Sequence, residues 1–218
     1  MNQNNNNNKF FDYSTTIILV MSFAAAATVI VNVTSGTALA QVPYADNHNA
    51  TVSPANMTLE SARAQYMLVW NHTRFNASFS TFIEPQSAAG FGVYREHGSS
   101  IFRPGEMVVL YVEPVGYGYK RIADNQGNNT LYLMNMTGGI VISDSNGSVL
   151  LTKNDVPVGS IISHRTNTEL FLELTLAQQR PLFPTGDYVI TYTITDQVSG
   201  QSFRLEKQIK ISGAPMLS

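Results

Sequence analysis

The sequence predicts a mainly β protein, an antiparallel β-sandwich preceded by one short helix and an apolar N-terminal segment. Three observations lead to this fold class. From residue 75 onward, apolar and polar residues alternate in short runs with a period of two, and Gly, Pro and Asn separate the runs. One stretch before them has the spacing of a helix. The length of 218 residues fits one domain with an appendage.

The first forty residues have the pattern of a secretory signal peptide. Ile17 to Val31 is apolar apart from a serine and a threonine, and Lys9 precedes it. Ala38 and Ala40 supply the small residues that signal peptidase requires, so that Gln41 would begin the mature chain.

A retained membrane anchor is the alternative interpretation of the same segment. Residues 15–40 contain no charge, and about 20 apolar residues suffice to cross a bilayer. In that case residues 15–35 would form a membrane helix, and the rest of the chain would remain outside the membrane.

The mature chain is expected to begin with an exposed lead-in over residues 41–56, followed by a helix. Asn56 or Thr58 can cap this helix, which ends near Trp70. Trp70, the only tryptophan, is expected to anchor the helix on the sheet. The predicted buried face consists of Leu59, Ala62, Tyr66, Met67 and Trp70.

The strands follow at short spacing. They are predicted over residues 75–83, 91–96, 107–113, 130–136, 139–144, 148–152, 170–176, 188–195 and 203–211. Residues 107–113 are apolar on both faces, as in a central strand. Lys207 interrupts the apolar face of the last strand, which favours an edge position for it. The predicted organisation is 1–40 signal peptide or anchor, 41–56 lead-in, 57–84 helix and first strand, and 85–218 sandwich.

The closing part of the chain resembles an immunoglobulin-like module. The segment 182–188 looks like the turn and tyrosine that open the penultimate strand of such a domain, and 196–200 then turns the chain into the last strand. Residues 102–106 and 110–113 also look like the opening of exported prokaryotic β-sandwich proteins. The resemblance covers about residues 91–212 and implies a cysteine-free immunoglobulin-like or fibronectin-type surface module, of a kind expected in archaea.

Asparagine usage indicates export and N-glycosylation. Outside the N-terminal run, 8 of 13 asparagines begin an Asn-x-Ser/Thr sequon, whereas Ser and Thr at 38 of 218 residues would give about two by chance. Asn32 would leave with a cleaved signal peptide. The predicted glycosylation sites are Asn49, Asn56, Asn71, Asn76, Asn128, Asn135 and Asn146.

Composition excludes several classes of function. The net charge of −2 argues against nucleic-acid binding, and the absence of cysteine excludes disulfides, thiolate metal sites and cysteine nucleophiles. The four histidines lie far apart, and no familiar hydrolase motif is present. The sequence therefore predicts neither a cofactor nor a metal and indicates that the protein is not an enzyme, with an enzyme or metal carrier as the least favoured alternative.

The most unusual segment runs from Glu113 to Arg121. Tyr117 and Tyr119 lie among glycines and are followed by Lys120 and Arg121, a composition that suits a binding lip for sugars or carboxylates. The competing interpretation is a hairpin whose tyrosines cover the core. A second exposed stretch, His164 and Arg165, would join this lip only if both loops share one end of the sandwich.

These observations favour a non-catalytic exported module that contacts proteins or glycans at the cell surface or envelope. The alternative is an extracytoplasmic accessory subunit of a membrane complex, held by an uncleaved N-terminal helix. Both predict an extracellular or cell-surface location and no nucleic-acid partner.

Overall fold

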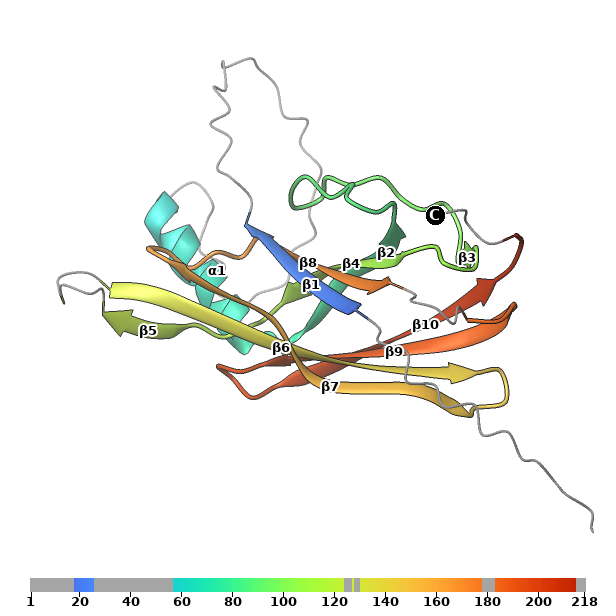
Figure 1. Ribbon diagram of the computed structural model, residues 1–218. Coiled ribbons are helices and arrows are strands. Elements are labelled where there is room, and N and C mark those ends of the chain that lie inside the picture. The colour runs from blue at the N-terminus through green and yellow to red at the C-terminus, as the bar shows by residue number, and fades with distance from the viewer. Residues whose placement is uncertain (1–17, 26–56, 124–126, 128–129, 178–182, 215–218) are drawn as a thin grey trace, which may run out of the picture.

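The computed structural model describes residues 18–25, 57–123, 127, 130–177 and 183–214 (Figure 1). Its elements are β1 (Ile18–Ala25), α1 (Leu59–His72), β2 (Asn76–Ile83), β3 (Ile101–Phe102), β4 (Val108–Val115), β5 (Lys120–Ala123), β6 (Thr130–Asp144), β7 (Val149–Ser163), β8 (Leu170–Ala177), β9 (Gly186–Asp196) and β10 (Ser202–Ile211). The predicted mainly β class with one short helix is confirmed.

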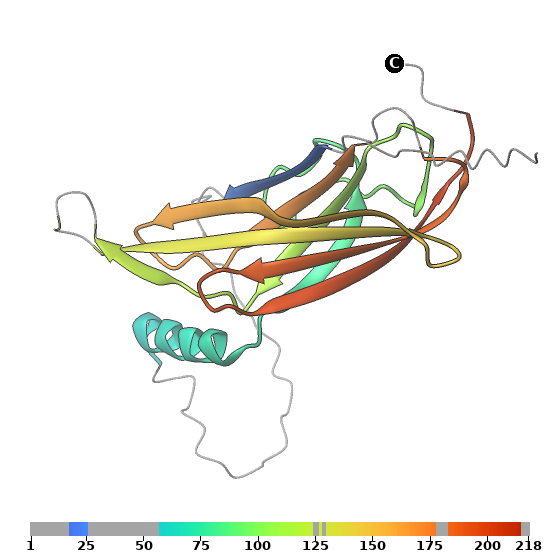
Figure 2. The same ribbon diagram turned by 60° about the horizontal axis from the view of Figure 1, so that its bottom comes forward.

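The strands form two sheets. The first has the order β1-β8-β4-β2, and the second has the order β3-β10-β9-β6-β5, with β7 also paired to β6. All pairs are antiparallel except the two-residue pairing of β3 with β10. The sheets are strongly curled, so that together they form a half-barrel (Figures 1 and 2).

One apolar core fills the space between the sheets. On β8 the inward-facing leucines at 170, 172, 174 and 176 are at most 1% exposed, as the alternation in the sequence predicts. They face isoleucines of β6 and β9 and the aromatic Tyr192 in one continuous cluster. Burial of this apolar surface is the main force that holds the sheets together.

Helix α1 begins and ends close to the predicted positions. The Thr58 hydroxyl accepts a hydrogen bond from the Ser61 N–H, which caps the first turn. The predicted buried face is only partly correct. Trp70 is buried and Met67 packs on the core, whereas Leu59 is 86% and Tyr66 50% exposed. The helix contacts the sheets mainly through its C-terminal turn.

Strand β2 changes its buried face in the middle. Up to Ala77 the side chains alternate between the two faces as predicted. A register shift between Ala77 and Phe79 then interrupts this alternation. Ala77 packs on the main core, and Phe82 does so further along the strand. Ile83 instead belongs to the cluster on the outer side of the sheet, and Phe79 stacks there on Tyr94. The predicted single apolar face over residues 75–83 is therefore wrong beyond the bulge, because one extra residue reverses all later side chains.

Two other predicted strand boundaries differ from the structure. Residues 130–144 form one long strand, β6, and β7 extends to residue 163. Residues 91–96 are not a strand. They belong to a loop whose Phe91 and Tyr94 pack over Tyr111 on the outer face of the first sheet.

The centre of the predicted signal peptide or anchor is a strand. Residues 18–25 form β1, which pairs with all of β8 at the edge of the first sheet (Figure 1). The predicted cleavage residues Ala38, Ala40 and Gln41 and the lead-in 41–56 lie outside the described residues. Across the ranges given above, no helix has the length and apolar character needed to cross a membrane.

Candidate binding surface

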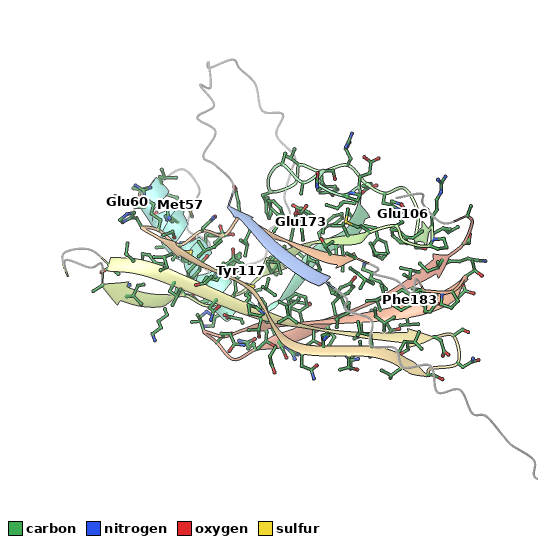
Figure 3. The ribbon with its side chains drawn as sticks, in the orientation of Figure 1. Met57, Glu60, Glu106, Tyr117, Glu173 and Phe183 are labelled. Carbon is green, nitrogen blue, oxygen red and sulfur yellow. The ribbon has the colours of Figure 1, made fainter. Side chains whose placement is uncertain are left out.

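The end of the molecule beside α1 is built on two tyrosines. Tyr117 is 1% exposed and lies between the helix and the sheets (Figure 3). The Trp70 ring meets the Tyr117 ring edge-on, with centroids 4.9 Å apart, and the Trp70 Nε1–H donates to the Tyr117 carbonyl at 3.0 Å. Trp70 is thus the anchor of the helix, as predicted.

Both tyrosine hydroxyls converge on one backbone carbonyl. The Tyr117 hydroxyl donates to the Asn167 carbonyl at 2.8 Å, and the Tyr119 hydroxyl donates to the same oxygen. Burial raises the pKa of both hydroxyls above the ordinary value, so they remain protonated donors. The loop after β7 is therefore tied to the turn between β4 and β5.

This tie brings the two predicted cationic stretches to the same end of the same sheet. Arg121 pairs with Tyr132 of β6, and Tyr132 pairs with Ser163, the residue before His164. Two strand spacings correspond to about 10 Å. The side chains of Lys120, Arg121, His164 and Arg165 are all exposed there.

The tyrosines themselves leave no room for a ligand. A cavity of about 10 Å³ lies beneath Tyr119 and Tyr132, which is space for one water at most. Tyr117 is a support below the surface rather than a contact on it. Any ligand at this end would meet the cations and the partly exposed Tyr119.

Asp196, which the sequence analysis did not single out, fixes this end from the other side. It is fully buried, and its carboxylate accepts hydrogen bonds from the N–H groups of Gly118, Val198 and Ser199 and from the Ser199 hydroxyl. The Gly118 bond, at 2.8 Å, spans 78 residues of sequence. The sequence Asp-x-x-Ser-Gly at residues 196–200 indicates a turn, but no sequence pattern indicates that Asp196 also binds Gly118.

Glycine allows the backbones to approach closely. Gly116 has φ +71°, and a Cβ on it would lie 2.4 Å from the Thr73 carbonyl oxygen at the end of α1. No other residue type would fit this position without moving the helix.

A second polar hollow lies at the opposite end, beside β3. His97 Nε2 lies 3.0 Å from Glu106 Oε1, and His97 Nδ1 lies 2.7 Å from the Ser99 carbonyl. The hollow has about 540 Å³ and is also lined by Arg103 and Ser212. Both ring nitrogens therefore lie within hydrogen-bonding distance of oxygen atoms, and these contacts hold the loop. In the part of the chain that the structure describes, no three His, Asp or Glu side chains gather as a metal site would require.

The described sequon asparagines differ in accessibility. Asn71 lies at the end of α1, Asn76 begins β2 and Asn146 lies in the turn after β6, and all three are exposed. Asn135 is half-buried within β6, opposite Ser160 of β7. Asn49, Asn56 and Asn128 lie outside the described residues.

Comparison with known proteins leaves the family open. No protein-family model matches the chain, and no curated protein matches it. One similar solved structure is described as a family 123 glycoside hydrolase from Clostridium perfringens, studied for glycolipid glycan hydrolysis. The identity is 7% and the TM-score 0.37, over 66% of this chain. The chain spans only 28% of that structure, and a likeness at this level assigns no activity.

Proposed function

We propose that the protein is an exported, N-glycosylated surface or envelope module that binds a protein or glycan and does not catalyse a reaction. The binding surface is the end that carries Lys120, Arg121, His164 and Arg165, here called the cationic end. The observation that carries this proposal is that strand pairing places Lys120 and Arg121 of β5 at the same end of the second sheet as His164 and Arg165, which follow β7. The hydrogen bonds of Tyr117 and Tyr119 to Asn167 tie these loops together, and a preorganised surface loses little entropy on binding.

The strand order supports an immunoglobulin-like type within this proposal. The orders β2-β4-β8 and β10-β9-β6 match A-B-E and G-F-C of such domains. The Tyr188 hydroxyl donates to the Pro184 carbonyl at 2.7 Å, the kind of bond that a tyrosine corner makes near the start of the penultimate strand.

Ligand chemistry follows from the charges. Exposed lysine and arginine favour an anionic partner, and arginine binds carboxylates through two parallel hydrogen bonds. We therefore expect a uronic-acid-containing glycan or an acidic protein segment as the partner of this end.

Binding of polygalacturonate and of polyglutamate to the full chain tests the cationic end. The double substitution K120A/R121A should weaken binding at least about tenfold, since each lost contact to a charged group is worth roughly 1.5–3 kcal/mol. The pair K153A/K210A, which removes two exposed lysines elsewhere, serves as the matched control. Equal losses in both double variants would show nonspecific charge attraction and contradict the proposal.

Intact mass and N-terminal sequencing of the native protein test export. A chain that begins at Gln41 and carries added hexose mass supports a secreted glycoprotein. An uncleaved chain that stays with the membrane fraction would favour the second candidate, an accessory subunit of a membrane complex. The uncharged run over residues 15–40 supports this candidate.

A further inference from the structure

Strand β8 receives its neighbour on one side from the N-terminus of the chain. On one edge β8 pairs with β4, and on the other edge it pairs over its whole length with β1. Its inward-facing leucines line the core directly behind this second edge. Whatever lies along this edge therefore completes both the sheet and the core.

The space along this edge holds one strand. β1 pairs with β8 and also lies within contact distance of β7, which belongs to the other sheet (Figure 2). A second complete sheet placed against β8 would collide with β7. The geometry therefore selects a single extended segment rather than the edge of another folded domain.

The topology shows why the place beside β8, here called the slot, would be empty without β1. In the order β2-β4-β8-β1, the last place corresponds to strand D of an immunoglobulin-like sheet. Here the chain instead continues through β7, which stays with β6, and then enters β8 directly. Among the residues that the structure describes, only 18–25 supply a strand on this side of β8.

Cleavage after Ala40 would remove those residues, and this step of the argument rests on the proposed function. The lead-in 41–56 that remains has Pro43 and Asp46 among its first residues and does not place three large apolar residues at alternate positions. The other undescribed segments that lie between described residues are at most five residues long. Neither the lead-in nor these segments combine the length and the apolar pattern of β1.

We propose that the edge of β8 that β1 covers, once cleavage has removed residues 18–25, accepts one extended strand from another exported protein, which completes the sheet by strand addition. The register of β1 defines the donor. Leu19, Met21 and Phe23 stand opposite the inward-facing Leu176, Leu174 and Leu172. The donor runs antiparallel to β8, has large apolar residues at three alternate positions and contains no proline.

A further requirement comes from Glu173. This half-buried carboxylate lies on the outer side of β8, opposite Ser22. A small polar or cationic donor residue fits this position, whereas an acidic one would be repelled.

The test uses the full chain with a protease site inserted between Ala40 and Gln41. The probe is a fluorescent peptide with the sequence of residues 18–25, flanked by lysines for solubility. After cleavage and removal of the leader, the probe should bind at least about tenfold more tightly than to the uncut chain, because tethered β1 competes at high effective concentration. Hydrogen exchange should show new protection in residues 170–177.

Two altered probes provide the matched controls. Asparagine at the core-register positions 19, 21 and 23 should abolish binding, whereas asparagine at positions 20 and 24 should leave most of it. Equal binding to cut and uncut chains, equal binding of both altered probes, or no protection of residues 170–177 would overturn the proposal.

Two results on the protein alone would also overturn it. If the cut chain forms a dimer with residues 170–177 protected, a second copy occupies the slot. If the native protein retains residues 18–25, the slot is filled within the chain and the cleavage step of the proposed function fails, even where the probe binds in vitro.

Discussion

At the residue scale, Asp196 joins parts of the chain that are far apart in sequence. D196A would leave the partly buried N–H of Gly118 and the N–H groups of Val198 and Ser199 without this acceptor. We expect a loss of about 3 kcal/mol in the free energy of unfolding. Denaturant titration measures this loss, and D187A, at an exposed residue, should change stability by less than about 0.5 kcal/mol.

Gly116 and Gly147 form a matched pair for backbone substitution. Both have positive φ, but a Cβ at 147 meets open space, whereas one at 116 meets the Thr73 carbonyl oxygen. G147A should cost about 1 kcal/mol from conformation alone, and G116A should cost at least about 3 kcal/mol or prevent folding. Similar costs for the two variants would show that α1 can simply move away.

Buried tyrosines make the protein sensitive to alkali. Burial raises the pKa of Tyr111, Tyr117, Tyr119 and Tyr192 above the ordinary value of 10. Above pH 10 the unfolded chain releases protons that the folded chain keeps, so stability is present below that pH and falls above it. Tyrosinate absorbance from these four residues should therefore appear together with the loss of circular dichroism, and ionisation of all ten tyrosines in a protein that keeps its circular dichroism would contradict this.

At the element scale, the sequence predicts β8 and β9 well because each buries one regular alternation. It fails for β2, where a bulge that no residue pattern announces turns Phe79 outward. It also fails for the face of α1. Leu59 and Tyr66 have helical spacing, but spacing does not reveal that only the end of the helix reaches the sheet.

Strand β10 is not the outermost strand as predicted, because β3 pairs with its last two residues, Lys210 and Ile211. Over the rest of its open edge β10 carries a lysine that points inward. Lys207 lies between the buried Phe203 and Ile209 on the core side, and its Nζ donates to the Ser80 carbonyl at 3.3 Å. Burial lowers its pKa.

K207V should leave the fold intact but promote association through this edge, because an inward charge is one of the features that keep open strands apart. Sedimentation velocity at increasing concentration measures the effect. K210V, at an exposed outer position of the same strand, is the control. Monomeric K207V at all concentrations would show that the charge has no such role.

At the scale of the whole molecule, the candidate site was predicted in part. The sequence identified the tyrosines and the cations, and it stated the condition under which they would meet. It could not show that the Asn167 carbonyl fulfils this condition, since a hydrogen bond between residues 117 and 167 leaves no local pattern. Nor could it show that residues 18–25, within the predicted signal peptide, pair with β8 as a strand.

Low charge over the whole surface leads to a prediction about glycans. Charged residues make up 13% of the chain, about half the usual share of roughly 25%. If glycans at exposed positions such as Asn71, Asn76 and Asn146 supply the missing hydration, enzymatically deglycosylated protein should aggregate at a lower concentration than the native protein. Light scattering compares the two, and equal solubility would count against glycan hydration.

Two hydrogen bonds between residues far apart in sequence also affect when the chain can fold during synthesis. The Phe75 N–H donates to the Gln201 side chain, 126 residues later, and Lys207 reaches Ser80 across 127 residues. If the protein is exported as proposed, a chain that enters a translocation pore from its N-terminus cannot form these contacts until its last strands emerge, and folds with such distant contacts form slowly. Under that proposal the unfolded chain would remain suitable for transport, and the fold would close only when transport is nearly complete.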